Sequence, residues 1–239
     1  MLPTVKKKSW YRKWWGIALI GLIVMLIAIL MVFVFQFGKI FNQIKHGDYL
    51  AVNAATENPP YEMEKFIDPL SPSIGAKDAK IVIVEFGDFN CSQCLKAFPI
   101  VREIAEKYKD KILLYWRNYP VVAENSIDFA RASVCAQQQN KFWALHDKFF
   151  QLQGKIEPEN FSEIAVKTGI NKTQFEKCLQ NNLTEAQIRK DFYAGEDGEV
   201  RGTPTFFING YKIEGPIPFE IWEQIIGNLL TIYGENTGN

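Results

Sequence analysis

Residues 80–94 read KIVIVEFGDFNCSQC, and this stretch decides the fold expected for the chain. Its first part, residues 80–86, is a short β-branched run typical of a buried strand. Its second part places Cys91 and Cys94 in a C-x-x-C spacing directly after that strand. Residues 91–109 then carry apolar side chains at three- and four-residue spacing, which indicates a helix. A strand, a C-x-x-C pair and a helix in this order indicate dithiol chemistry.

The two cysteines of this motif are expected to play different parts. A thiolate at the start of a helix is stabilised by free backbone N–H groups and by the helix dipole. Cys91 comes first, so it should have a lowered pKa and act as the nucleophile. Cys94 lies one turn further on, where it can resolve the mixed disulfide that Cys91 forms with a client. The Ser92 hydroxyl could donate to the Cys91 sulfur.

Other uses of a C-x-x-C pair fit the sequence less well. A structural zinc site needs two further ligands at suitable spacing. Cys135 and Cys178 lie 41 and 84 residues beyond Cys94, and His46 and His146 are the only histidines. A structural disulfide across so short a loop would close too little chain to stabilise the fold much. No metal site is therefore expected.

The rest of the body alternates strands with a long helical block. Residues 111–117 form a second strand pattern, and residues 125–195 are helical in pattern almost throughout. Residues 205–210 and 211–214 predict two strands that meet at an Asn-Gly turn, and residues 218–233 predict an amphipathic helix. This order predicts an α/β fold whose helices are grouped into one insertion.

A long apolar segment precedes this body. Residues 14–37 read WWGIALIGLIVMLIAILMVFVFQF and contain no charge. As a helix they would cover roughly 36 Å, enough to cross a hydrocarbon core of about 30 Å. The alternatives are a cleaved signal peptide, whose apolar region is usually shorter, and a buried core helix, which would need a larger protein around it. We expect an uncleaved transmembrane anchor in the lipid bilayer.

The charges give this anchor an orientation. The chain has 27 basic and 27 acidic residues, but residues 1–37 hold five basic residues and no acid. The positive-inside rule then places residues 1–13 in the cytoplasm and the body outside, as a single-pass protein of the cell membrane. A location outside the cytoplasm allows disulfide bonds to form and persist. The body is mildly acidic, and the zero net charge argues against nucleic-acid binding. Residues 38–67 are rich in turn-formers and are expected to form a linker to a domain at residues 68–239.

From about residue 68 to the final helix, the chain resembles the DsbA-like thiol–disulfide oxidoreductases of the thioredoxin superfamily. The resemblance is carried by IVEFGDFNCSQC at 83–94, YWRNYPV at 115–121, CAQQQNKFWALHDKFF at 135–150 and VRGTPTFFING at 200–210. It implies a thioredoxin fold with a helical domain inserted at about 122–198. The family's dipeptide between the cysteines is often Pro-His, and here it is Ser92-Gln93, so the resemblance does not fix the oxidising strength.

The resemblance also assigns further site residues. Thr203-Pro204 matches the loop before the family's cis-proline, which faces the cysteine pair and offers backbone to an extended client. Ser92 and Gln93 would lie beside the same client. Glu85 matches a buried acid that could relay the proton to or from Cys94. The alternative for Glu85 is a strand end that points to solvent.

The remaining cysteines and His146 lie in helical patterns. Cys135 and Cys178 could be two buried free thiols, but a matched pair in an oxidising space is more often bridged. Some DsbA-like relatives also carry a second disulfide in the helical domain, so we expect a structural Cys135–Cys178 bridge. His146 sits in an aromatic helical stripe, where a packed histidine is a better interpretation than a catalytic one.

These features predict a membrane-tethered protein-disulfide oxidoreductase that needs no cofactor. Its substrates would be exported client proteins with reduced cysteines. The resemblance implies a membrane reoxidation partner of the DsbB or vitamin K epoxide reductase type. Two alternatives stay open, a reductase or isomerase working in the opposite direction and a non-catalytic thioredoxin-fold binding module.

Overall fold

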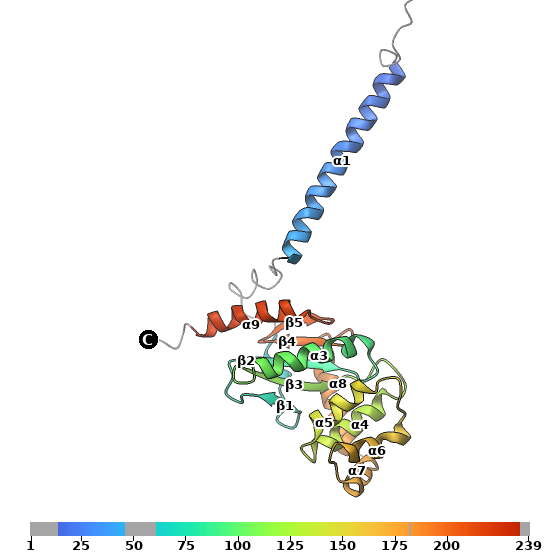
Figure 1. Cartoon of the computed structure of the whole chain (residues 1–239), viewed down its shortest axis with the longest axis vertical. Coiled ribbons are helices and arrows are strands. Elements are labelled where there is room, and N and C mark those ends of the chain that lie inside the picture. The colour runs from blue at the N-terminus through green and yellow to red at the C-terminus, as the bar shows by residue number, and fades with distance from the viewer. Residues whose placement is uncertain (1–13, 46–60, 182, 235–239) are drawn as a thin grey trace, which may run out of the picture. The chain divides into compact units, whose positions relative to one another are not determined.

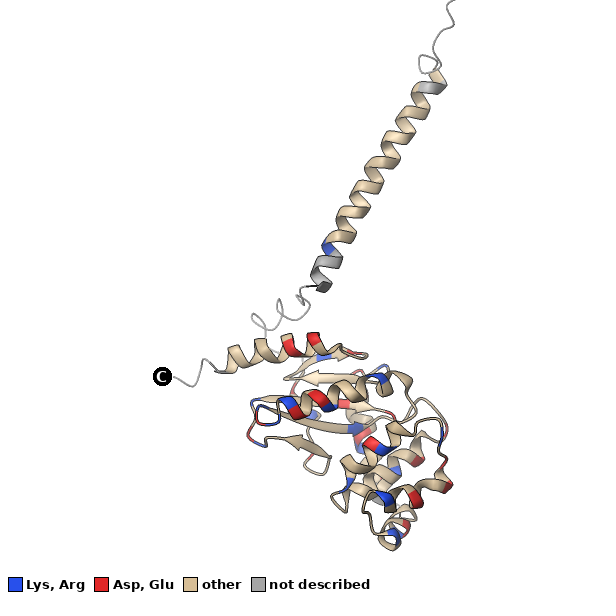
Figure 2. Cartoon of the chain, in the orientation of Figure 1, with Lys and Arg blue, Asp and Glu red and all other residues tan. Residues whose placement is uncertain are grey.

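The computed structural model describes residues 14–45, 61–181 and 183–234, in two compact units, Met1–Val52 and Asn53–Asn239. The first unit contains helix α1 (Trp14–Lys45), which has no charged residue before Lys39 (Figure 2). Its side chains from Ile17 to Lys39 are exposed, and these residues form a candidate membrane span. Its length and apolar composition are those of a helix that can cross a lipid bilayer.

The second unit is built on a mixed sheet (Figure 1). Within the described residues the sheet has five strands in the order β1-β3-β2-β4-β5. The bounds are Ser73–Gly75 for β1, Ile81–Gly87 for β2, Ile112–Asn118 for β3, Thr205–Ile208 for β4 and Tyr211–Glu214 for β5. β2 and β3 are parallel, and the other neighbouring strands are antiparallel. The predicted Asn-Gly turn joins β4 to β5, with positive φ at Asn209 and Gly210.

Successive residues of β2 point to opposite faces of the sheet, as the pleat requires. Val84 and Phe86 belong to an apolar cluster that includes Ala194 of helix α8 (Leu183–Asp197). On the other face, α3 (Ser92–Lys107) and α9 (Phe219–Gly234) pack against the sheet. Glu85 points toward this second face, so the strand that precedes the C-x-x-C pair directs its one carboxylate beneath α3.

The helical insertion lies between β3 and β4, as the sequence predicts. It consists of α4 (Ser126–Gln137), α5 (Phe142–Gln151), the short turn η3 (Pro158–Asn160), α6 (Phe161–Lys167), α7 (Lys172–Leu179) and α8. The core of the insertion is rich in aromatic side chains and forms one hydrophobic cluster with Cys91 and Cys94. Phe89, which lies between β2 and α3, and Trp116 of β3 belong to the same cluster. A Cβ at Gly87 would lie 2.2 Å from the Trp116 ring, so only glycine permits this close packing.

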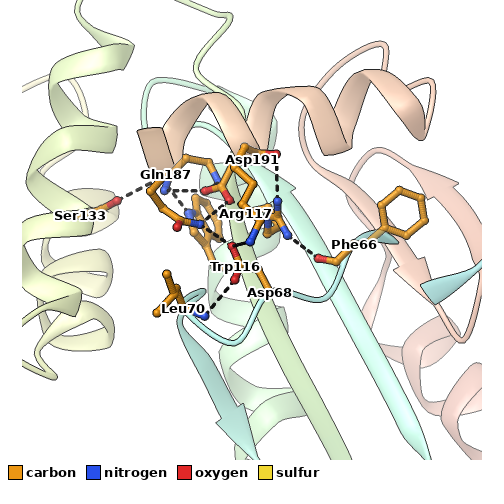
Figure 3. A network of polar contacts seen from close by, with 10 residues as sticks. Phe66, Asp68, Leu70, Trp116, Arg117, Ser133, Gln187 and Asp191 are labelled. Atoms are coloured by element: carbon orange, nitrogen blue, oxygen red, sulfur yellow. Dashed lines mark hydrogen bonds and ion pairs between the residues drawn. The ribbon is translucent and has the colours of Figure 1, made fainter. Parts of the chain in front are cut away.

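A buried polar network fastens the insertion to the sheet (Figure 3). The Arg117 guanidinium, on β3, lies 2.7 Å from an Asp191 carboxylate oxygen on α8 and donates to the Phe66 carbonyl at 2.6 Å. Asn118 donates its backbone N–H to Asp191 at 3.1 Å and accepts from the Ser133 hydroxyl of α4 at 3.0 Å. Because these groups are buried and mutually paired, they fix how α4 and α8 sit on β3.

The structure differs from the sequence predictions at the edges of this unit. The predicted linker, 38–67, is shorter at both ends, because α1 continues to Lys45 and the chain packs onto the body again from Tyr61. The turn η2 (Met63–Lys65) leads into Phe66, which is 1% exposed and stacks on Phe207. Strand β1 was not predicted either, because three residues are too few to show a period. The part of the linker at 46–60 and the basic segment 1–13 lie outside the described residues.

Candidate active site

The cysteine pair sits where β2 turns into α3. Residues 88–91, here called the redox loop, form a tight turn in which the Cys91 N–H donates to the Asp88 carbonyl at 3.0 Å. Cys91 is the N-cap residue of α3, with extended backbone, and its carbonyl accepts from the Leu95 N–H. Cys91 and Cys94 are free thiols, 7% and 0% exposed. The strand and helix predicted around the motif therefore place both sulfurs at the first turn of a helix.

The surroundings of Cys91 favour its thiolate. The Cys94 thiol donates to the Cys91 sulfur, and this contact is the largest of the effects that lower the pKa of Cys91 to about 5. Partial burial opposes the shift, while the backbone N–H groups of Gln93 and Cys94 add to it. The protonated thiol instead donates to the Thr203 carbonyl at 3.0 Å. A thiol with this pKa is ionised at neutral pH and is both a nucleophile and a good leaving group.

Cys94 has the opposite electrostatics. Burial is the main cause that raises its pKa far above the ordinary thiol value, and the neighbouring Cys91 and Glu85 raise it further. Glu85 is 4% exposed, and burial raises its pKa to about 8. The carboxyl is therefore protonated at neutral pH, beside the sulfur that must gain or lose a proton in each exchange cycle.

Replacing Glu85 with glutamine is expected to stabilise the reduced protein at alkaline pH. The folded pKa exceeds the unfolded value of about 4.5, so the folded state binds the proton more tightly. The protonated Glu85 carboxyl therefore makes its full contribution to the free energy of unfolding below pH 4.5, and this contribution is lost as the pH rises through 8. Urea unfolding should show the variant more stable at pH 9, by on the order of 2–5 kcal/mol, and similar at pH 5. An equal difference at both pH values would contradict a buried neutral carboxyl.

The other residues predicted to contact clients surround the Cys91 sulfur. The Thr203–Pro204 peptide bond is cis, and Pro204 is buried while Thr203 is partly exposed. Ser92 and Gln93 are exposed at the start of α3. The structure thus brings Thr203 to Cys91 and leaves Ser92 and Gln93 open to solvent beside it. Pro99 lies inside α3.

Cys135 and Cys178 are joined by a disulfide that links α4 to α7 across a sequence separation of 43. His146 lies on α5, is 4% exposed, and has the aromatic rings of Phe89, Trp116 and Phe150 around it. Burial lowers its pKa, and its Nδ1 contacts Asp147 at 2.9 Å. The disulfide belongs to the insertion, and His146 belongs to the aromatic packing.

Two residues near the sulfurs were missed by the sequence reasoning. Asp88 is 2% exposed, and its carboxylate accepts hydrogen bonds from the backbone N–H groups of Val121 and Val122 and from the Ser126 hydroxyl. Gln153 donates to carbonyls of the redox loop from the turn after α5. Asp88 gave a signal, a charge between apolar residues one turn before Cys91. Gln153 gave no signal, because it lies far from Phe89 and Cys91 in the sequence and no local pattern predicts a hydrogen bond between them.

Known proteins are similar to this chain in sequence and in fold. A thioredoxin family model matches residues 68–228. A "Probable disulfide bond formation protein D" from Bacillus anthracis is 31% identical over 159 residues, which cover 62% of this chain and 73% of that protein. A periplasmic thioredoxin-like protein from Salmonella enterica serovar Typhimurium has a TM-score of 0.62 and 26% identity, over 71% of this chain and 95% of that structure.

Other curated relatives are longer proteins of another kind. The "Na(+)/H(+) antiporter NhaA 1" of Mycolicibacterium vanbaalenii is 31% identical over 160 residues, which are 64% of this chain and 26% of the antiporter. The chain therefore spans about a quarter of the length of that relative, and the match gives no ground for ion transport here. With the family model matching residues 68–228, most of the folded unit, the chain belongs to the thioredoxin family.

Proposed function

We propose that the chain introduces disulfide bonds into exported proteins through Cys91 and Cys94. The observation that carries the direction is the low pKa of Cys91, about 5. A stabilised thiolate lowers the free energy of the reduced form and makes the disulfide form a stronger oxidant. Buried Cys94, with its raised pKa, leaves Cys91 as the sulfur that clients meet.

The exchange would run in two steps. A client thiolate attacks the Cys91 sulfur of the Cys91–Cys94 disulfide, that bond breaks, and its electron pair goes to Cys94, which takes a proton from Glu85. A second client thiolate then attacks the client sulfur of the mixed disulfide and releases Cys91 as a thiolate. In net terms the client loses two electrons and two protons. The protein gains the two electrons and, once solvent has restored the proton of Glu85, one proton; the other proton stays in solvent because Cys91 is released as a thiolate. Thr203 and Pro204 would offer backbone to the client during both steps, with Ser92 and Gln93 beside it.

The proposed location of the catalytic unit rests on the anchor, and the proposed reoxidation partner rests on the resemblance. With five basic residues before the apolar segment 14–37, the positive-inside rule supports a cytoplasmic N-terminus and an extracytoplasmic catalytic unit. The similar thioredoxin-like protein from Salmonella is periplasmic, which supports the same location. A membrane oxidase linked to quinone, of the DsbB or vitamin K epoxide reductase type, would take the two electrons and restore the disulfide. Residues 46–60 would serve as the tether between the two units.

The opposite direction is the second candidate. The Ser92-Gln93 dipeptide lacks the histidine that the family often carries between its cysteines, and its absence removes one group that would stabilise the thiolate. A weaker oxidant would act as a reductase or isomerase at the same sulfurs. The contacts of Cys91 with Cys94 and Thr203 stand against this candidate, since they supply a low pKa without a histidine.

A client-oxidation experiment tests the proposal. The full chain in detergent, with Cys91 and Cys94 oxidised, is mixed with an equimolar reduced peptide that contains two cysteines. We expect the peptide to become intramolecularly disulfide-bonded while Cys91 becomes reactive toward an alkylating reagent. If the peptide stays reduced at equilibrium, and the reduced chain instead cleaves the oxidised peptide, the proposed direction is wrong.

The orientation is tested separately on intact cells. A membrane-impermeant maleimide should label Cys91 of the reduced chain from outside, and the Cys91→Ala variant should lose that label. Labelling that requires cell lysis would place the catalytic unit in the cytoplasm and contradict the proposed location.

A further inference from the structure

Within the described region, three side chains connect the redox loop to the insertion: Asp88 and Asn90 of the loop, and Gln153 of the insertion. The Asp88 carboxylate reaches the start of the insertion at Val121, Val122 and Ser126. Asn90 donates its side-chain amide to Asn125 at 2.8 Å and to the Ser126 hydroxyl at 3.1 Å. Gln153, from the far end of α5, makes the third contact. The first two tie the loop to a segment close to β3, whereas Gln153 ties it to the body of the insertion.

The geometry of Gln153 is that of a two-point clamp. Its Nε2 donates to the Phe89 carbonyl at 2.6 Å and to the Cys91 carbonyl at 3.0 Å, so both amide hydrogens are used. Its backbone N–H is held by the Phe150 carbonyl at 3.2 Å, next to Leu152, the C-cap residue of α5, and Gly154 follows with φ +73°, which turns the chain away. The side chain is therefore presented to the loop by a defined helix end.

We propose that Gln153 is a positioning residue that sets the reactivity of Cys91 from the inserted helical domain. The inference rests on the assignment of Cys91 as the nucleophile. Gln153 does not touch the sulfur. It holds the carbonyl of the same residue, Cys91, and the carbonyl two residues earlier, so it fixes the start of α3.

This position matters because the start of α3 supplies donors to the thiolate. The N–H groups of Gln93 and Cys94 stabilise the Cys91 sulfur, and their direction depends on where the helix begins. The carbonyl oxygens of Phe89 and Cys91 carry partial negative charge in the loop that holds the thiolate. A neutral amide that donates to both oxygens reduces their repulsion of that charge and adds no charge of its own. The insertion thereby contributes to the chemistry and not only to the shape of the molecule.

Two substitutions with opposite chemistry test the role. Gln153→Ala removes both donors and should raise the pKa of Cys91 by about 0.5–1 unit. Gln153→Glu places an acceptor-only carboxylate against two carbonyl oxygens and should raise it by more than about one unit. The pKa is measured from thiolate absorbance at 240 nm across a pH series, with the full chain in detergent. The equilibrium constant of the Cys91–Cys94 pair against glutathione should shift toward the disulfide form by about threefold to tenfold in the alanine variant.

The chain offers a matched control at Gln139. This glutamine also makes a two-point contact, donating to the Asn171 carbonyl at 3.3 Å and accepting from the Asn171 N–H at 2.8 Å, but within the insertion. Gln139→Ala removes the same kind of contact and should leave the pKa of Cys91 and the glutathione equilibrium unchanged.

The outcomes separate this inference from the proposed function. If the parent chain has a low Cys91 pKa and both Gln153 variants match it and the Gln139→Ala variant, the positioning role is overturned. If the Gln153 variants lose thermal stability but keep the parental pKa of Cys91, the positioning role is also overturned, because the contact then contributes to stability alone. If the parent chain itself has an ordinary thiol pKa, the account of Cys91 as a stabilised thiolate fails first, and the role of Gln153 fails with it.

Discussion

Replacing Cys91 with serine is expected to abolish thiol–disulfide exchange, with a loss of more than about a thousandfold in the rate at which the chain oxidises a dithiol peptide. Cys91 is the cysteine at the start of α3, and its pKa of about 5 makes it the thiolate at neutral pH. A serine hydroxyl in the same place is neither ionised nor able to form a disulfide. The measurement is the initial rate of peptide oxidation by the full chain in detergent.

The matched variant is Cys94→Ser, which keeps the nucleophile and removes the resolving thiol. Cys94 is 0% exposed, so clients should react at Cys91 and remain attached to it. When mixed with the oxidised peptide, Cys94→Ser should accumulate a mixed disulfide, because its Cys91 thiolate attacks the peptide disulfide and releases one peptide thiolate. The adduct is visible by mass spectrometry and released by a reductant, and Cys91→Ser should accumulate none. Adducts on Cys94 in the Cys91→Ser variant, formed at the parental rate, would reverse the roles given to the two cysteines.

Replacing Cys135 and Cys178 together with alanine is expected to cost stability without costing exchange. The disulfide joins α4 to α7 across a sequence separation of 43. The chain-entropy model gives about 4 kcal/mol for a loop of this length, or a fall of about 10 °C in melting temperature for a unit of this size. Urea unfolding and thermal scans of the double variant measure the loss, and peptide oxidation is measured at a temperature where the variant is folded.

The exchange rate of this double variant should stay within about twofold of the parent, because the disulfide lies within the insertion and the reacting sulfurs are Cys91 and Cys94. A folded double variant without exchange activity would show that this disulfide takes part in turnover.

Much of the fold could be predicted because the signals were local. The β-branched run before the cysteines, the Asn-Gly turn and the helical block each depend on residues close together in the chain, and the structure contains all three. The apolar segment at the N-terminus likewise depends on composition alone, and α1 includes it. The resemblance predicts Glu85 to be a buried acid near Cys94, and the alternation of side chains along β2 turns it toward α3.

The parts that could not be predicted depend on contacts between distant segments. Phe66 lies in a stretch with the composition of a linker, and its burial comes from stacking on Phe207, far along the chain. Strand β1 forms because β3 offers it an edge, not because its own three residues favour a strand. Gln153 reaches Phe89 and Cys91 only after the insertion has folded back over the redox loop. No local pattern reveals such a contact.

The central claim is that the Cys91–Cys94 pair is an oxidant because the Cys91 thiolate is stabilised without a neighbouring histidine. It is tested most directly by the reduction potential of the pair, measured for the full chain in detergent after equilibration with glutathione and quenching by alkylation. For this two-electron couple about 30 mV changes the equilibrium constant tenfold. The account predicts a potential well above that of the glutathione couple. A potential near that of thioredoxin, about −270 mV, would contradict it and make the chain a reductant.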